Sequence, residues 1–591
     1  MTGAASPHGD AARAYLGRAL RWSPLGLWVA LLSSMLWAGR HPSGDGPHIL
    51  GTCMRLGWQL RTLQLPTFME NWFSLVAPHP PGGYLLPSLL YALAGPQTWV
   101  PWLASVLYLA LVWDAILRML DAMETRGAWG VALCLAAAPM LWGQMEVHGM
   151  DFVSAALTAK CLSHLMASRG LTVVGQARRA GLWLGIGFWV KYTFPVFLLA
   201  PCLGILGYLL WDRLRGREDM VQRLRCGIQL TGFFVLSAGP LFIFQGRAII
   251  NYIHHSIAPS REEVLLMGSL GSASGFATSD LDKALFYAAV LKDLWGWPGL
   301  ALLGAGLLAL MVGWISRRRA EGRDPDHALR ASVLGLLCVL GGTLLLSLFM
   351  MKASRYMLPM LIPMIAVLVP PISKRLLTAP LVPAAMAPLL LFVVTDYAGI
   401  TDWQNFDSGA GAVSFARDSR GAASQFRTFD HFASETFSHW GRYPLPEEAF
   451  RPVSQNPQGF NLTALSRAVA AVVPSEGGKV AIYAPENHPG PTFGVLLMST
   501  EQLGHHWDFI TIKILPQQGA PSGFKPFYFQ GPFFHDQPNT FDAVVIVGDL
   551  RDPLARRFFQ GQRLKETFAL GSGQNRIRVL YPPDKTEQKW P

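Results

Sequence analysis

Long apolar runs separated by short polar segments fill roughly the first two thirds of the chain. A helix needs roughly 17 to 25 residues to cross a bilayer, and the runs that reach or approach this length predict about eleven membrane spans. They are placed at residues 21–38, 98–120, 127–144, 150–167, 180–193, 194–211, 226–244, 296–316, 328–350, 355–372 and 379–397. The segment 83–95 is shorter and contains Pro87, so we expect a helix that lies at the membrane interface.

The basic connections between the spans fall on one side of this topology. With the amino terminus inside, the inner loops include "DRLRGREDMVQRLR" and "SRRRAEGR", whereas loops 39–97 and 245–295 fall outside. Lys and Arg concentrate in the cytoplasmic loops of membrane proteins. We therefore expect residues 1–20 to be a cytoplasmic segment, 21–397 to form a multi-pass domain in the inner (plasma) membrane, and 398–591 to be extracytoplasmic.

Residues 398–591 differ from the rest in having long polar stretches with many Pro and Gly. Two runs, "KVAIYAP" at 479–485 and "FDAVVIVGDL" at 541–550, have the composition of strands. The glycines in "GSGQNR" lack the strand–turn–helix setting of a nucleotide site. The sequence therefore predicts a soluble α/β domain. We expect this domain to select or position a molecule on which the membrane part acts.

Composition agrees with a membrane protein. Of 591 residues, 51% are hydrophobic and 15% are charged, whereas soluble domains have about 25% charged residues. The net charge is +11, but Lys and Arg form short clusters between spans rather than a basic face, so we expect no nucleic-acid partner. Most of the cysteines lie in or beside apolar runs, so no disulfide framework is expected.

Ionisable residues gather at the predicted outer ends of the spans. Charges near a membrane are costly and usually mark a site. The candidates are Asp45 and His79 in the first outer loop, Asp151 at the start of the fourth span, Lys191 and Tyr192 at the end of the fifth, and Lys352, Arg355 and Tyr356 at the tenth. Carboxylates can remove a proton or hold a metal, and cations can bind a phosphate, so this set predicts a site for a lipid phosphate.

Five short motifs in order resemble the GT-C class of membrane glycosyltransferases, and within it the protein O-mannosyltransferases and the lipid-A aminoarabinose transferases. They are an acid after the first span, "HPPG" at 79–82, "MDF" at 150–152, "VKYT" at 190–193 and "RYMLPMLIP" at 355–363. The resemblance covers roughly residues 20–400. It implies inverting transfer of a sugar from a polyprenyl-phosphate carrier to a lipid, glycan or protein acceptor on the outer side of the membrane.

The resemblance also implies roles for single residues. Asp45 matches the catalytic base, and Asp151 matches a second acid that organises the acceptor or a metal. Lys191 and Arg355 match positions that meet the carrier phosphate. The remaining candidates for substrate binding are His79, Tyr192, Lys352 and Tyr356. The rigid "HPPG" motif would then fix the position of the loop that carries Asp45. Relatives have a second acid after the first, whereas Gly46 stands here, which argues against a carboxylate pair at this point.

Other interpretations of these residues stay open. Asp45 also suits a turn, Asp151 suits a helix N-cap, and Lys191 and Arg355 suit interfacial anchors that reach the headgroups. A lipid or sugar transporter or flippase is the alternative function, but transporters usually show repeated halves and charges near the bilayer centre. A scaffold would not need eleven spans. No cofactor is evident, and the need for a divalent metal is left open.

Overall fold

The fold is described from a computed structural model of the whole chain. The described residues are 19–33, 46–74, 80–97, 99–125, 127–136, 149–214, 220–257, 275–276, 303–316, 327–348, 351–352, 354–375, 462–474, 476–483, 506–516, 524–530, 533–535, 541–547, 564–570 and 577–581, with a few isolated positions between them. The boundary expected at 397–398 lies outside this part of the chain. It therefore stays a prediction.

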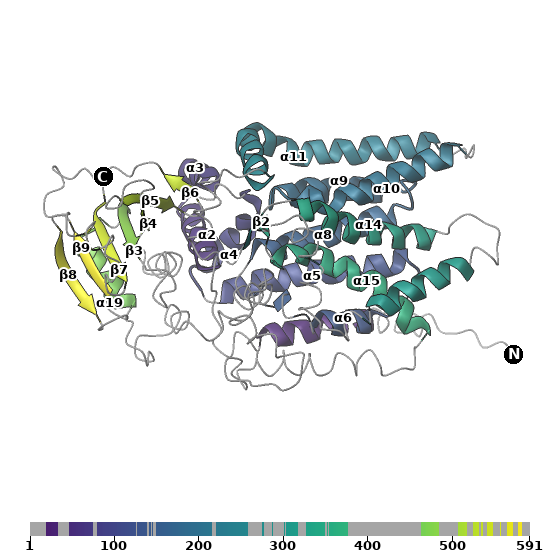
Figure 1. Cartoon of the computed structure of the whole chain (residues 1–591), viewed down its shortest axis with the longest axis horizontal. Helices are drawn as coiled ribbons and strands as arrows, with labels where there is room; N and C mark the ends of the chain where they lie inside the picture. Colours follow the sequence, from purple (N-terminus) through teal and green to yellow (C-terminus); the bar gives the residue numbers. More distant parts are fainter. Residues whose placement is uncertain are drawn as a thin grey trace.

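A bundle of helices forms the larger part of the molecule (Figure 1). Its main members are α5 (Trp99–Ala122), α6 (Ala128–Ala136), α8 (Met150–Ala167), α9 (Val174–Phe188), α10 (Phe194–Leu214), α11 (Met220–Ile257), α14 (His327–Leu348) and α15 (Leu358–Arg375). Four helical segments are long and apolar enough to cross a membrane: Trp99–Ala122, Phe194–Leu214, Val221–Arg247 and His327–Leu348. These segments indicate an integral membrane protein.

The predicted spans agree with these helices to different degrees. The spans at 98–120, 194–211 and 328–350 match α5, α10 and α14 closely. Helix α9 begins six residues before the predicted start at 180, because Arg178 and Arg179 belong to the helix rather than to the loop before it. The span at 379–397 lies outside the described residues, so the total of eleven stays a prediction.

Helix α8 lies at the centre of the bundle. Every residue from Met150 to Met166 is buried, and the helix packs against α5, α9, α14 and α15. Glycines allow close packing at its neighbour α9: a Cβ on Gly181 would lie 2.1 Å from the backbone oxygen of Leu230 in α11. Small residues at helix interfaces are typical of membrane bundles, because they let backbones approach each other.

Three shorter helices lie between the bundle and the carboxyl-terminal part (Figure 1). They are α2 (Gly46–Arg61), α3 (Leu65–Ser74) and α4 (Gly82–Ala94). Helix α4 matches the segment predicted to lie at the interface, and Pro87 is inside it. Helix α2 packs on α4 so closely that a Cβ on Gly57 would lie 2.7 Å from Cβ of Tyr91.

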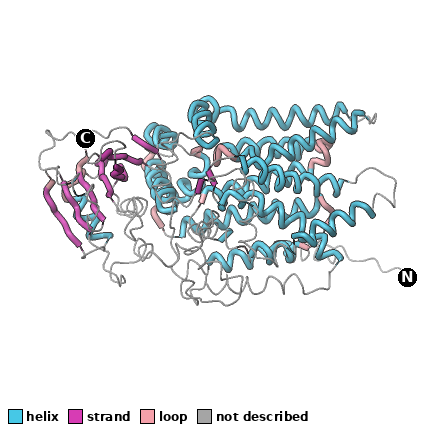
Figure 2. The backbone as a smooth tube through the Cα atoms, viewed as in Figure 1, coloured by secondary structure: helices cyan, strands magenta, loops and turns pink. Residues whose placement is uncertain are grey.

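The described residues after 461 form a mixed sheet with helix α19 (Leu462–Ala470) (Figure 2). The strand order is β6-β5-β4-β3-β7-β9-β8. The strands are β3 (Glu476–Tyr483), β4 (His506–Pro516), β5 (Phe524–Gln530), β6 (Phe533–His535), β7 (Ala543–Val547), β8 (Lys565–Leu570) and β9 (Ile577–Tyr581). The two strands predicted from sequence are β3 and β7. They pair in parallel at the centre, with Val480 opposite Ala543.

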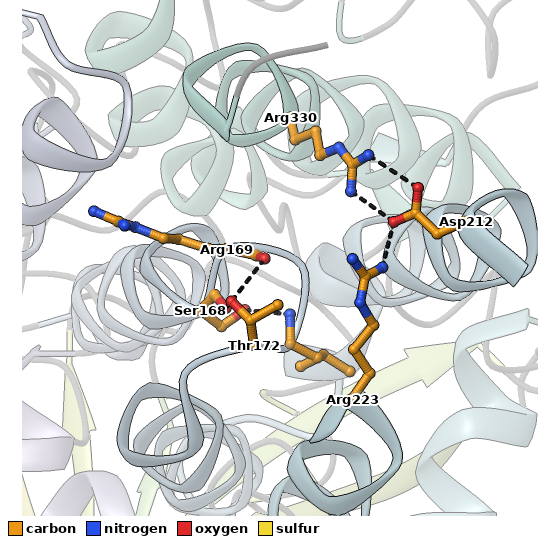
Figure 3. A network of polar contacts seen from close by, with 7 residues as sticks. Ser168, Arg169, Thr172, Asp212, Arg223 and Arg330 are labelled. Carbon is orange, nitrogen blue, oxygen red and sulfur yellow. Dashed lines mark hydrogen bonds and ion pairs between the residues drawn. The ribbon is translucent and has the colours of Figure 1, made fainter. Parts of the chain in front are cut away.

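Charged residues connect three helices at the end of the bundle opposite α2, α3 and α4. This end is called the inner end here, after the predicted topology. Asp212 of α10 accepts hydrogen bonds from Arg223 of α11 and, through both its oxygens, from Arg330 of α14 at 2.9 and 3.1 Å (Figure 3). All three side chains are buried. Each of these residues belongs to a helix end that the predicted topology places inside, and the side of the membrane on which they lie stays a prediction.

A second, partly buried ion pair joins α5 and α8. Lys160 of α8 contacts Asp114 of α5, and Asp114 also accepts a hydrogen bond of 2.9 Å from Arg118. The Lys160 ammonium lies 5.9 Å from the ring centre of Trp183. Because Asp114 has two cationic partners, its charge stays compensated if one of them is removed.

Candidate functional site

A buried Lys–Asp pair lies at the end of the bundle that faces α4, here called the outer end. The Lys191 ammonium contacts the Asp151 carboxylate, and both side chains are at least 90% buried. Lys191 also lies 4.2 Å from the ring centre of Tyr356, which is a cation–π contact. Three predicted site residues from separate parts of the sequence therefore meet.

Each of these residues comes from the end of a helix. Asp151 is in the first turn of α8, whose N-cap residue is Gly149. Lys191 lies in the short turn between α9 and α10, and Tyr356 lies in the 3-10 helix η1 (Ser354–Met357) that precedes α15. The N-cap interpretation of Asp151 is not supported, because the N-cap position belongs to Gly149. Lys191 is buried against Asp151 rather than extended as an exposed anchor.

Burying two charges at the end of a membrane bundle is costly. The interaction of the pair offsets this cost only when the geometry is good, and an apolar pair of similar volume is often equally stable or more so. The retention of Asp151 and Lys191 is therefore poorly explained by stability alone. Ionisable residues of this kind in membrane proteins usually belong to a functional site.

The rigid corner "PPGG" at 80–83 packs against residues that neighbour this pair in sequence. The Gly82 N–H donates a 2.7 Å hydrogen bond to the Trp189 carbonyl. A Cβ on Gly82 would lie 2.6 Å from Cβ of Trp189, and a Cβ on Gly83 would lie 2.3 Å from Sδ of Met150. Met150 adjoins Asp151 in sequence, and Trp189 is two residues before Lys191. The corner thus holds the two segments that carry the ion pair.

The role predicted for this corner stays a prediction. We expected "HPPG" to hold Asp45 in place, but Asp45 and His79 lie outside the described residues. The described contacts of the corner are with segments far away in sequence. The spacing of residues in the sequence could not predict these partners. The close contact requires glycines in the corner, and which segment packs against them is decided only by the fold.

Stacked aromatic rings reinforce the corner. Trp72 of α3 stacks on Trp189 with ring centres 5.7 Å apart, and it also stacks on Phe68 at 5.8 Å. Its indole N–H donates a 2.8 Å hydrogen bond to the Pro81 carbonyl. The Trp189 indole N–H in turn donates to the Ser237 carbonyl of α11 at 2.7 Å. These rings therefore pack α3, the corner, the α9–α10 turn and α11 together.

Tyr192 has a partner that the sequence did not reveal. Its hydroxyl donates a 2.8 Å hydrogen bond to Oε1 of Gln245, and both residues are buried. Gln245 has non-helical backbone angles within α11. Its side-chain amide also donates a long hydrogen bond of 3.4 Å to the Phe73 carbonyl. The one feature of the sequence that could have indicated this contact is the polar Gln245 directly after the predicted apolar span at 226–244.

A short two-stranded sheet joins two further outer segments. Strand β1 (Gly275–Phe276) from loop 245–295 pairs antiparallel with β2 (Met351–Lys352). Arg355 follows in η1, directly before Tyr356. The side chains of Lys352 and Arg355 lie outside the described set, so their part in the site stays a prediction.

A metal site is not evident at this end of the bundle. Within the described ranges, no three His, Cys, Asp or Glu residues are grouped as metal ligands. The chemistry that the described residues themselves provide is a buried cation, a carboxylate and an aromatic face.

Comparison with known proteins identifies the fold. No protein-family model matches the sequence, and no curated protein matches it significantly. Among solved structures, the chain is similar to ArnT from Cupriavidus metallidurans bound to undecaprenyl phosphate, with a TM-score of 0.51, 13% identity, and coverage of 97% of this chain and 99% of that one. It is also similar to the apo state of ArnT, with a TM-score of 0.51, 12% identity, and coverage of 96% and 98%.

ArnT is a lipid-A aminoarabinose transferase of the GT-C class, one of the two groups that the sequence motifs resemble. The similarity extends beyond residues 20–400, where those motifs lie, to nearly the whole chain. At this identity it shows a shared fold. The resemblance drawn from the motifs is therefore confirmed at the level of structure: the chain has the fold of ArnT.

Proposed function

We propose that this protein is a membrane glycosyltransferase that moves a sugar from a polyprenyl-phosphate-linked donor to an acceptor on the outer side of the membrane. The observation that carries the proposal is the buried pair of Lys191 and Asp151, with Tyr356 beside it, at the outer end of an ArnT-like bundle. One of the similar ArnT structures was solved with undecaprenyl phosphate bound. That ligand has the phosphate and apolar chain expected of the donor's carrier.

In the proposed reaction, the anomeric carbon of the sugar is transferred between two oxygen atoms. The acceptor hydroxyl attacks this carbon from the side opposite the phosphate, while Asp45 accepts the hydroxyl proton. The bond from the anomeric carbon to the phosphate oxygen breaks, and its electron pair leaves on the polyprenyl phosphate. The configuration at the carbon is inverted.

Lys191 and Arg355 would stabilise the negative charge that develops on the departing phosphate. A fixed cation in a site with little water stabilises such charge strongly. Before the donor binds, Asp151 compensates the charge of Lys191. Once the donor is bound, the proposed role of Asp151 is to orient the acceptor or to help hold a metal.

The experiment is sugar transfer by the purified full-length protein, with a radiolabelled polyprenyl-phosphate sugar as donor. We expect Lys191→Gln to lower kcat by about 10² to 10³-fold, the typical effect of losing one group that stabilises transition-state charge. Lys160→Gln is the matched control, because Lys160 is also a buried lysine that pairs with an aspartate near an aromatic ring. It should leave transfer per folded molecule close to wild type. Equal loss in both variants would contradict the proposed site.

A further inference from the structure

The carboxyl-terminal sheet contacts the helix nearest to it through a buried arginine. Arg55 of α2 donates a 2.6 Å hydrogen bond to the backbone carbonyl of Trp507 in β4. Arg55 is 7% exposed, and Trp507 is fully buried. A hydrogen bond from a charged donor is among the stronger polar contacts in proteins.

The position of Trp507 in the sheet explains why its carbonyl can accept this bond. Strand β4 pairs with β5 over Thr511–Pro516, so Trp507 lies before the start of that pairing. The register with β3 shifts between Glu476 and Lys479, opposite this point. The indole is fixed by a 2.7 Å hydrogen bond to the Pro474 carbonyl, which holds the Trp507 backbone in one orientation.

From Arg55 a continuous series of packed residues leads to the Lys191–Asp151 pair. In α2, the Cys53 thiol donates a hydrogen bond of 3.6 Å to the Tyr84 carbonyl of α4. Tyr84 directly follows the Gly82–Gly83 corner, which packs on Trp189 and Met150. Cys53, Tyr84, Met150 and Trp507 belong to one buried hydrophobic cluster. Within the described residues, α2 and α4 thus connect the sheet to the segments that carry the ion pair.

We infer that the carboxyl-terminal sheet positions the corner at Gly82–Gly83, and with it the Lys191–Asp151 pair, and that Arg55 is the positioning residue for this contact. This inference rests on the proposed function for its effect on transfer, but not for its effect on structure.

The structural readout is amide hydrogen exchange in the full-length protein, compared between wild type, Arg55→Met and Arg55→Lys. The Gly82 amide reports on the corner, because its N–H is bonded to the Trp189 carbonyl. We expect Arg55→Met to speed exchange in α2 and at the corner by about tenfold to a hundredfold, as for loss of a hydrogen bond from a charged group. Lys retains a charged donor, so Arg55→Lys should restore part of the protection.

The matched control is Arg61→Met, which removes an arginine from the last turn of the same helix. Arg61 is exposed, and this change should leave exchange at the corner as in wild type. If Arg55→Met leaves exchange at the corner unchanged, the contact does not position the corner and the inference is wrong.

The functional readout is transfer by the same variants. We expect Arg55→Met to lower kcat by about tenfold to a hundredfold while KM for the donor changes little, because small displacements of reacting groups have effects of this size. Faster exchange with unchanged kcat would show that Arg55 does not position the site. If the wild-type protein transfers no sugar, the proposed function fails, whereas the exchange data still decide whether the sheet holds the corner.

Discussion

The two ends of the bundle each contain a buried aspartate with cationic partners, but the partners differ in kind. At the inner end, two arginines share Asp212, and Arg330 binds it through two parallel hydrogen bonds (Figure 3). At the outer end, one lysine meets Asp151 and lies over the ring of Tyr356. The inner cluster is built on the planar, two-pronged guanidinium of Arg330, whereas the cation in the outer pair is a lysine ammonium, which is a compact point charge.

This difference indicates different tasks. A bidentate guanidinium fixes the angle between the helices that carry it, which suits a structural joint of α10, α11 and α14. A lysine is a compact point charge that can follow a phosphate through a reaction. The segments beside the lysine are in turn held by a proline–glycine corner and stacked rings. We therefore propose that the inner end has a structural role and that the outer end carries the chemistry.

The largest effect is expected from Asp45→Asn, which tests whether the base belongs to the outer end. The change removes a charge and keeps the shape, so transfer should fall by about 10² to 10⁴-fold, the usual contribution of a general base. Asn is as good as Asp in a turn, so near-normal transfer would support the turn interpretation. The control is Asp121→Asn at the inner end, where Asp121 is exposed and pairs with Arg21. It should transfer sugar normally.

Asp212→Asn should lower stability rather than catalysis. Removing this carboxylate leaves two buried guanidinium groups without their common partner, and breaking a buried pair in this way costs about 3 to 5 kcal/mol. The midpoint of thermal unfolding of the purified protein should fall, while transfer per folded molecule stays near wild type. An unchanged midpoint with lost transfer would reverse the assignment of the two ends.

Gly82→Ala should have a smaller effect that appears at the outer end. The added Cβ would lie 2.7 Å from the Trp189 carbonyl oxygen, a backbone atom that cannot move away alone. Overpacking of this kind costs about 1 to 3 kcal/mol, and here it should also displace Lys191 and lower transfer. Gly232→Ala is the control, because a Cβ there has no atom within 4 Å among the described residues. Equal behaviour of the two variants would show that the corner does not hold the site.

The sequence predicted the broad architecture well for physical reasons. Apolar runs of the length of a bilayer directly predicted helices such as α5 and α14, and β-branched runs predicted β3 and β7. The meeting of Asp151, Lys191 and Tyr356 followed from topology, because residues at the outer ends of adjacent spans must be neighbours. The resemblance to known glycosyltransferases rested on the same residues, and the fold supports it.

Other features could not be predicted because they depend on particular partners in space. Nothing in the sequence links Gly82 to Trp189, Tyr192 to Gln245, or Arg55 to the Trp507 carbonyl. The acceptor in the last of these contacts is a backbone atom, which has no signature in the sequence. Similarly, Arg223 lies in a predicted inner loop and Arg330 at the start of a predicted span, and nothing in the sequence indicates that both bind Asp212.

Binding of undecaprenyl phosphate is the measurement that tests the central claim most directly, since it needs neither the sugar nor the acceptor. The affinity of the purified protein for this lipid should be measured for wild type, Lys191→Gln and Lys160→Gln. A charge-assisted hydrogen bond lost from the site should weaken binding by about tenfold to a hundredfold in Lys191→Gln, while Lys160→Gln binds as wild type does. Wild-type affinity in Lys191→Gln, or an equal loss in Lys160→Gln, would contradict the assignment of the donor site to the outer end.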